Sequence, residues 1–184
     1  MKREFLGDTY DAVKRLWRDV LQDWAPLYFE PRFVPDDLRE EFARLTGIPV
    51  LEDGTAGPHT ILNDPDTGIR LPGTGNQAEG RTHITVPSVA SQLRMQGVRC
   101  VITFDQSDYR GGHLDRRAQR QIKLGALREE GFDGFYYVSH APFLFAAPDR
   151  STCAAVWRLL TAAGLPVSRL EALQERPGGT CCSV

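Results

Sequence analysis

The stretch VRCVITF, residues 98–104, is the best candidate for a buried strand in this chain. Its β-branched and apolar residues do not alternate strictly with polar ones, which is the pattern of a strand covered on both faces. It runs directly into FDQSDYRGG, where Asp105 opens a polar, glycine-containing segment. Strands of this kind are typical of α/β sheets, in which sites gather at the carboxyl ends of the parallel strands.

Helical and strand-like patterns alternate around this segment. Apolar spacing and end signals predict helices at 10–24, 36–45, 87–97, 114–130 and 151–163. Further strand-like segments are 48–51, 60–63, 83–86 and 166–170. The aromatic-rich stretch FDGFYYVSHAPFLFAAP, residues 132–148, predicts two strands joined around 139–142. We therefore expect an α/β fold, a two-layer or three-layer sandwich with a mixed, mainly parallel sheet and a late antiparallel hairpin.

Composition and charge narrow the class of protein. The 184 residues suit one domain, expected over 1–176, followed by a flexible tail over 177–184. The net charge is −2, so any binding of nucleic acid must come from a local basic patch. No run of about 18 apolar residues is present, and we expect a cytoplasmic protein with no membrane partner.

The four cysteines and the glycine-rich segments carry no strong motif. The cysteine spacing indicates neither a disulfide framework nor a zinc site. The final CCSV matches the outline of a prenylation box at Cys181, and a frayed tail is the alternative. The segment PGTGNQAEG, residues 72–80, imitates a dinucleotide fingerprint, but no clear strand precedes it and no periodic helix follows, so we expect a mobile loop.

Acidic side chains and one histidine fall near the ends of strand-like segments. Carboxylates that converge at a sheet edge can hold Mg²⁺ or Mn²⁺ through oxygen ligands and activate water against a phosphoester. We predict Asp105 and His140 as catalytic residues. The predicted metal ligands are Asp8, Asp64, Asp66 and Asp105.

Each of these residues also has a structural interpretation. In GDTYD, Asp8 and Asp11 resemble a helix-capping arrangement. Asp105 can cap the loop that follows its strand, and a histidine in an apolar stretch, such as His140, is often a satisfied core residue.

The pentapeptide DPDTG, residues 64–68, has a turn-forming alternative of its own. Pro65 suits the second position of a type I turn and Gly68 suits its close, so that 69–71 would return as the second strand of a hairpin. A metal-binding role instead requires ILND, residues 61–64, to end a central strand beside the strand that ends at Asp105.

A basic cluster follows Asp105 and gives the second functional signal. Three of its members, Arg116, Arg120 and Lys123, share one helical face. Two glycines at 111–112 add a possible anion nest ahead of that helix. The predicted phosphate-binding residues are Arg110, Arg116, Arg120 and Lys123. The alternative is a solvated helix face that complements nearby acids.

Two family resemblances arise at these residues. Asn63-Asp64-Pro65 and the hairpin at 132–147 resemble the acid-proline motif and the late strands of uncharacterised bacterial and phage proteins with a short methyltransferase-like core. That resemblance covers about residues 58–150 and implies S-adenosylmethionine as the ligand. Asp8-Thr9 and Thr103-Phe104-Asp105 resemble the first and late acids of PIN-like nucleases. In that resemblance, Glu40 or Glu41 stands in for a middle acid.

Acids for a metal ion and arginines for phosphate favour a metal-dependent phosphoester hydrolase, with Mg²⁺ or Mn²⁺ as cofactor. Its expected substrate is a nucleic acid or a nucleotide. A methyltransferase-like domain, active or degenerate, is one alternative. A non-catalytic binding module, related to phage or to defence against phage, is the other.

Overall fold

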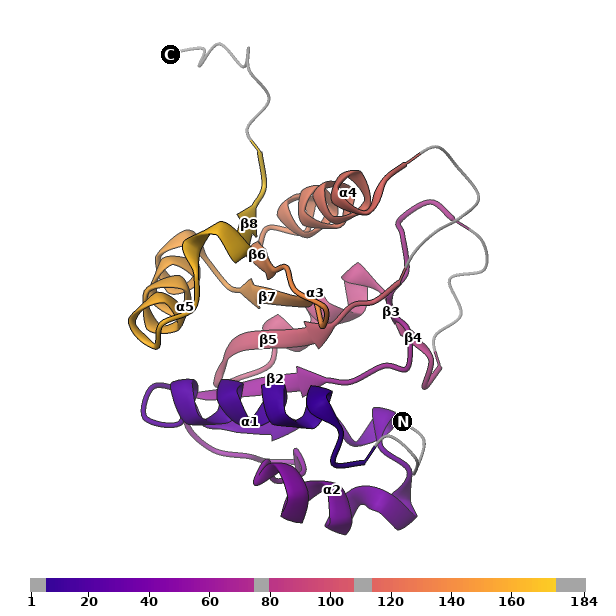
Figure 1. Ribbon diagram of the computed structural model, residues 1–184, viewed down its shortest axis with the longest axis vertical. Helices are drawn as coiled ribbons and strands as arrows, with labels where there is room; N and C mark the ends of the chain where they lie inside the picture. Colours follow the sequence, from indigo (N-terminus) through magenta and orange to yellow (C-terminus); the bar gives the residue numbers. More distant parts are fainter. Residues whose placement is uncertain (1–5, 75–79, 108–113, 175–184) are drawn as a thin grey trace.

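The computed structural model describes residues 6–74, 80–107 and 114–174, and these form an α/β fold around one six-stranded sheet (Figure 1). The strands are β1 (Leu27–Phe29), β2 (His59–Asn63), β5 (Val98–Phe104), β7 (Phe143–Ala147), β6 (Asp133–Tyr137) and β8 (Leu170–Ala172), in this spatial order. Parallel pairing joins β1 to β2 and β2 to β5, whereas β7 is antiparallel to both β5 and β6. Consequently β1, β2, β5 and β6 run in one direction and β7 and β8 in the other. The predicted mixed sheet with its late hairpin is confirmed.

Helices cover both faces of this sheet and make three layers. The helices are α1 (Thr9–Leu21), α2 (Arg39–Thr46), α3 (Val86–Leu93), α4 (Arg116–Glu129) and α5 (Arg150–Ala162). Short 3₁₀ turns lie at Pro31–Phe33, Asp36–Leu38 and Val167–Arg169. Figure 1 shows α4 apart from α1 and α5. The two buried apolar clusters agree, because α1 and α5 contribute side chains to one cluster, and α3 and α4 contribute side chains to the other.

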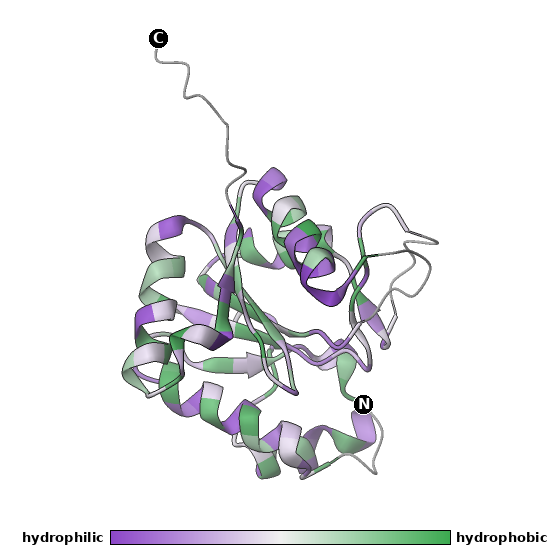
Figure 2. Ribbon diagram, turned by 45° about the horizontal axis from the view of Figure 1, so that its top comes forward, coloured by the Kyte–Doolittle hydropathy of each residue, from purple (hydrophilic) through white to green (hydrophobic). Residues whose placement is uncertain are grey.

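The side chains of β7 show why two cores form. Phe143 and Phe145 enter one cluster with Trp17 of α1, whereas Leu144 and Ala146 enter the other with Leu124 of α4. Successive strand residues point to opposite faces, so a strand that is apolar throughout is covered on both sides. Trp17 packs its edge against Phe143 and Phe145, with ring centroids 5.7 Å and 5.2 Å away. Figure 2 shows that helices surround the central strands, which carry many hydrophobic residues. The helices themselves carry both hydrophobic and polar residues.

The pentapeptide DPDTG leads the chain out of the main sheet and does not close a hairpin. β3 (Gly68–Ile69) pairs in parallel with β4 (His83–Ile84) in a separate two-stranded sheet. The prediction that 69–71 returns antiparallel to 60–63 is therefore wrong. β2 is instead a central strand between β1 and β5.

Most predicted elements are found with small shifts in their ends, and three segments differ. The predicted strand at 166–170 is a 3₁₀ turn at Val167–Arg169 followed by β8 at Leu170–Ala172. Residues 27–29 form the edge strand β1, which was not predicted from the sequence because prolines at 26 and 31 flank this short segment. The predicted strand at 48–51 is reduced to a single bridge between Val50 and Phe29. None of the helices in the described part of the chain is long and apolar enough to cross a membrane.

Candidate functional site

The fold brings the two predicted catalytic residues, Asp105 and His140, and one predicted metal ligand, Asp64, to one edge of the sheet. Asp64 follows β2, Asp105 follows β5, and His140 lies in the connection after β6. Because these three strands run in the same direction, their carboxyl ends meet at that edge. Proximity in the fold therefore agrees with the placement expected from the sequence, and the hydrogen bonds show what each side chain does there.

Asp105 is the centre of a buried polar network. Its Oδ1 accepts hydrogen bonds from the backbone N–H groups of Ile69 (2.9 Å) and Ser107 (3.3 Å). Its Oδ2 accepts from the ammonium of Lys123 and from the hydroxyl of Tyr136, each at 2.7 Å. The Ser107 hydroxyl lies 2.5 Å from Oδ1 and accepts a hydrogen bond from Lys123 at 2.6 Å. A carboxylate has about four lone-pair sites, so that of Asp105 is already saturated.

The two side chains that hold Oδ2 are themselves buried. Lys123 is 1% exposed, and its charge is compensated by the salt bridge to Asp105. Burial first, and the Asp105 carboxylate second, raise the pKa of the Tyr136 phenol well above its ordinary value. Tyr136 therefore stays a neutral hydrogen-bond donor at physiological pH. This network fastens α4 and β6 to the end of β5.

Gly68 explains how the turn after β2 reaches Asp105. A Cβ at this position would lie 2.4 Å from Oδ1 of Asp105 and 2.6 Å from its Cα, and the backbone φ is +125°. Both the close approach and this backbone conformation favour glycine. The glycine of DPDTG thus brings the Ile69 N–H within hydrogen-bond distance of Asp105.

Asp64 belongs to a second buried ion cluster on the other side of the sheet edge. The ammonium of Lys14 lies 2.7 Å from Oδ2 of Asp64 and 2.9 Å from Oδ1 of Asp11. Burial lowers the pKa of Lys14, but the two carboxylates outweigh burial and raise that pKa above 10.5. The lysine therefore stays charged and joins α1 to the end of β2.

The remaining predicted metal ligands do not converge with these. Asp8 caps α1, accepting from the N–H groups of Tyr10 (2.8 Å) and Asp11 (3.2 Å). Asp66 is exposed in the turn that leaves β2. Among the described residues, no three histidine, cysteine, aspartate or glutamate side chains are grouped so that they could hold a metal ion.

A basic cavity of about 390 Å³ opens beside the Asp105 network, between α4 and the connection from β6 to β7. Of the described charged side chains that line it, three are cations and one, Asp105, is an anion. The cations are Arg116, Arg120 and Lys123. Arg120 is also paired at 2.8 Å with Glu171. Three of the four predicted phosphate-binding residues therefore share one wall, and the fourth, Arg110, lies outside the described residues.

The opposite wall of the basic cavity contains His140, which is exposed. Its ring is parallel to that of Tyr10, with an angle of 7° between planes and 6.3 Å between centroids. Gln106 bridges the two segments, donating to the Tyr10 hydroxyl (2.7 Å) and to the backbone carbonyl of His140 (3.3 Å). Phe104 supports Tyr10 from behind, at 5.4 Å between centroids. His140 is thus a surface group of the cavity and not a core histidine.

Sequence reasoning missed several residues at this edge, although some left a signal. Lys14 lies one turn from Tyr10 and from Trp17, within the apolar stripe of α1. Lys123 is one of the predicted phosphate-binding residues, but its role as the buried partner of Asp105 was missed. It lies one turn from both Gln119 and Leu127 on the buried face of α4. A lysine on an apolar helix face implies a buried partner. No comparable signal marked Tyr136 or Ser107, because their hydrogen bonds to Asp105 depend on the tertiary fold.

Comparison of the chain with protein-family models, with curated proteins and with solved structures found no match.

Proposed function

We propose that the basic cavity binds a nucleotide, or a nucleotide unit of a nucleic acid, and that the protein acts on its phosphoester. The observation that supports this most directly is the pairing of two kinds of surface in one small space. Arg116 and Arg120 line the cavity together with His140, and the ring of His140 is parallel to that of Tyr10, which lies next to His140 but outside the cavity lining. Guanidinium groups bind phosphate oxygens, and aromatic rings stack on bases.

The size and charge of the cavity fit such a ligand. Its volume of about 390 Å³ lies within the range of small-molecule sites, roughly 300–1,000 Å³. The Asp105–Lys123 pair is neutral as a unit, so the positive charge on this wall comes from Arg116 and Arg120, the second of which is paired with Glu171. A dianionic phosphate gains from this charge, whereas a neutral nucleoside does not.

In the proposed reaction, His140 is the side chain that transfers a proton. It is exposed in the cavity wall, and histidine is the side chain that most often serves as a general acid or base. Asp105 acts by holding Lys123 in place, since its own oxygens are occupied. Mg²⁺ or Mn²⁺ stays part of the prediction, and such an ion would have to be held mainly by phosphate oxygens of the substrate, because the described side chains offer no group of three ligands for it.

Binding is tested by titration calorimetry with AMP, adenosine and inorganic phosphate. We expect AMP to bind more tightly than either part alone. Arg116→Ala should weaken AMP binding about tenfold through loss of a charge-assisted contact. Arg117→Ala is the matched control, because Arg117 is the next residue of α4, is exposed and does not line the cavity. Equal losses in the two variants, or no binding of AMP, would contradict the proposal.

Activity is tested by release of nitrophenol from bis-p-nitrophenyl phosphate, with and without Mn²⁺. His140→Ala should abolish most of the release while leaving phosphate binding measurable. S-adenosylmethionine serves as the comparison ligand, because the methyltransferase-like resemblance implies it. Tighter binding of S-adenosylmethionine than of AMP would favour that alternative. AMP binding without any hydrolysis would favour a non-catalytic binding module.

A further inference from the structure

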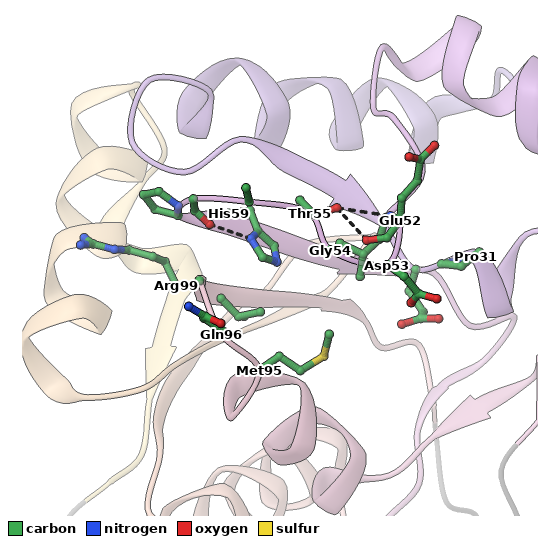
Figure 3. A pocket seen from close by; sticks show the side chains of 16 residues that line it. Pro31, Glu52, Asp53, Gly54, Thr55, His59, Met95, Gln96 and Arg99 are labelled. Atoms are coloured by element: carbon green, nitrogen blue, oxygen red, sulfur yellow. Dashed lines mark hydrogen bonds between the residues drawn. The ribbon is translucent and has the colours of Figure 1, made fainter.

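A larger cleft, of about 900 Å³, lies at the opposite edge of the sheet, where β2 and β5 begin. One wall is the segment 52–58 and the other is the turn 95–99 that follows α3. His59, the first residue of β2, lies between them (Figure 3). This cleft shares no residue with the basic cavity at the carboxyl edge.

The ring of His59 is held in one orientation. Its Nδ1 lies 3.0 Å from the backbone carbonyl of Gly57, and its backbone N–H donates to the carbonyl of Gly97 at 2.9 Å. Tyr28 packs against the ring edge-on, with 6.0 Å between centroids. Because a carbonyl can only accept, Nδ1 must carry a proton. In a neutral imidazole Nε2 is then a bare acceptor.

That acceptor has no hydrogen-bond partner within the described part of the chain. His59 is 2% exposed, and its Nε2 is among the buried atoms left unpaired. Buried polar atoms are nearly always paired in folded proteins, so an orphaned nitrogen beside a cleft indicates a ligand that supplies a donor.

Gly97 makes room for this arrangement. A Cβ there would lie 2.4 Å from the Gly57 carbonyl oxygen and 3.2 Å from Nδ1 of His59, at a backbone φ of +83°. The site therefore needs a glycine at this position to keep the ring and the carbonyl in contact.

The charges around the cleft specify the sign of the ligand. Its acidic side chains are Glu30, Glu52 and Asp53. Its one arginine among the described residues, Arg99, lies with its guanidinium 5.8 Å from the centroid of the Trp24 ring. Figure 3 shows Arg99 and Asp53 at opposite ends of the cleft, so the arginine does not neutralise that acid.

We propose that this cleft binds a small organic cation with N–H donors, an alkylammonium or a guanidinium group. One N–H donates to Nε2 of His59, and the positive charge faces Asp53 and its acidic neighbours. Nε2 is shielded from water in the unliganded chain, so entry requires a rim side chain to move. Met95 lines the cleft, is 48% exposed and has the flexible side chain typical of methionine, so it can move in this way. The ligand is opposite in charge to the proposed nucleotide, and the two sites are independent.

The first test needs no ligand. Long-range ¹⁵N–¹H NMR correlations of the histidine rings distinguish the two neutral tautomers. At pH 8 we expect His59, assigned by its absence from a His59→Asn variant, to be protonated on Nδ1 with a bare Nε2. A ring protonated on Nε2 would overturn the proposal, because that nitrogen could then not accept.

The second test uses agmatine, which carries a guanidinium and an ammonium, with neutral N-butylurea as the uncharged donor. Agmatine should bind and shift the Nε2 resonance of His59, whereas N-butylurea should bind at least several-fold more weakly. His59→Asn keeps a donor for the Gly57 carbonyl but removes Nε2, and should weaken agmatine binding about tenfold.

Asp53→Asn tests the charge without touching the core. It should weaken agmatine binding by about two- to fivefold, as expected for an exposed pair. Glu129→Gln, an exposed acid on α4 outside the cleft, is the control and should change nothing. If His59→Asn does not fold, the comparison of Asp53→Asn with Glu129→Gln still decides. Agmatine binding that is equal in all variants, or no binding, would overturn the proposal.

Discussion

Asp64 and Asp105 end neighbouring parallel strands, and each contacts a buried lysine at 2.7 Å, yet the two clusters differ in charge balance. Lys14 is shared between two carboxylates, Asp64 and Asp11, which leaves one negative charge in excess. Lys123 faces one carboxylate, Asp105, which is also held by the neutral donors Tyr136 and Ser107. In the first cluster, Asp11 also accepts a hydrogen bond from the Gly7 N–H (2.6 Å). In the second, the carboxylate accepts from three further donors, Tyr136, Ser107 and Ile69.

The difference also separates the two clusters by role. The Asp105 network adjoins the basic cavity and sets one of its walls, so its neutrality leaves the arginines to determine the potential there. The Asp64 cluster fastens α1 to β2 and does not line that cavity. Of the two strand-end aspartates, Asp105 therefore lies beside the proposed substrate site, whereas Asp64 stabilises the scaffold.

The largest effect is expected from Lys14→Met. Removing the shared cation leaves Asp11 and Asp64 buried together without a countercharge, although Asp11 keeps the hydrogen bond from the Gly7 N–H. Breaking a buried pair costs about 3–5 kcal/mol, and we expect the upper part of that range for the free energy of unfolding in urea. Arg15→Met, at the adjacent exposed position of α1, should change stability by less than about 0.5 kcal/mol. A loss below about 1 kcal/mol in Lys14→Met would remove the distinction between the clusters.

Alkaline pH tests the same cation without a mutation. The folded-state pKa of Lys14 is raised above 10.5, so its stabilising effect is complete below that pH and is lost as the pH rises through the folded pKa. The gap in unfolding free energy between the wild type and Lys14→Met should therefore stay constant from about pH 7 to 9 and narrow above about pH 10.5. A gap that widens in that window would contradict the raised pKa.

A smaller loss is expected from Lys123→Met, about 3 kcal/mol, the lower part of the range for a broken buried pair. Asp105 keeps hydrogen bonds from Tyr136, Ser107 and Ile69, which partly compensate its charge. Arg117→Met on the same helix is the control. If Lys123→Met proves more destabilising than Lys14→Met, the neutral donors do not compensate as proposed.

Tyr136→Phe should cost about 1–2 kcal/mol, because it removes one buried hydrogen bond and leaves the salt bridge in place. The measurement is again urea unfolding. In the Lys123→Met background the same change should cost more, since Asp105 then relies on the remaining donors. Additive losses would show that the two partners act independently.

The smallest effect is expected from Asp8→Asn. Asn is as good an N-cap as Asp, so α1 should lose less than about 0.5 kcal/mol, whereas Asp8→Ala should cost about 1 kcal/mol. The predicted metal role of Asp8 instead implies that Asp8→Asn reduces any rise in melting temperature caused by Mn²⁺. An unchanged Mn²⁺ response with intact stability would assign Asp8 to capping alone.

The sequence by itself determined much of the architecture, because hydrophobic period and turn residues act locally. VRCVITF is apolar enough to require cover on both faces, and the aromatic stretch at 132–148 contains two strands separated by a proline-containing turn. The same local signals placed Asp64, Asp105 and His140 at strand ends, and three basic residues on one face of a helix.

What those side chains contact was decided only by the tertiary structure. Asp64 and Lys14 are 50 residues apart, and Asp105 receives donors from Ile69, Lys123 and Tyr136 on three different elements. A carboxylate at a strand end binds whatever cation or donor the packing brings near, and no local pattern distinguishes a lysine from a metal ion in that place. Long-range packing therefore made two predicted metal ligands into buried salt bridges, and it left the orphaned nitrogen of His59 beside a second cleft.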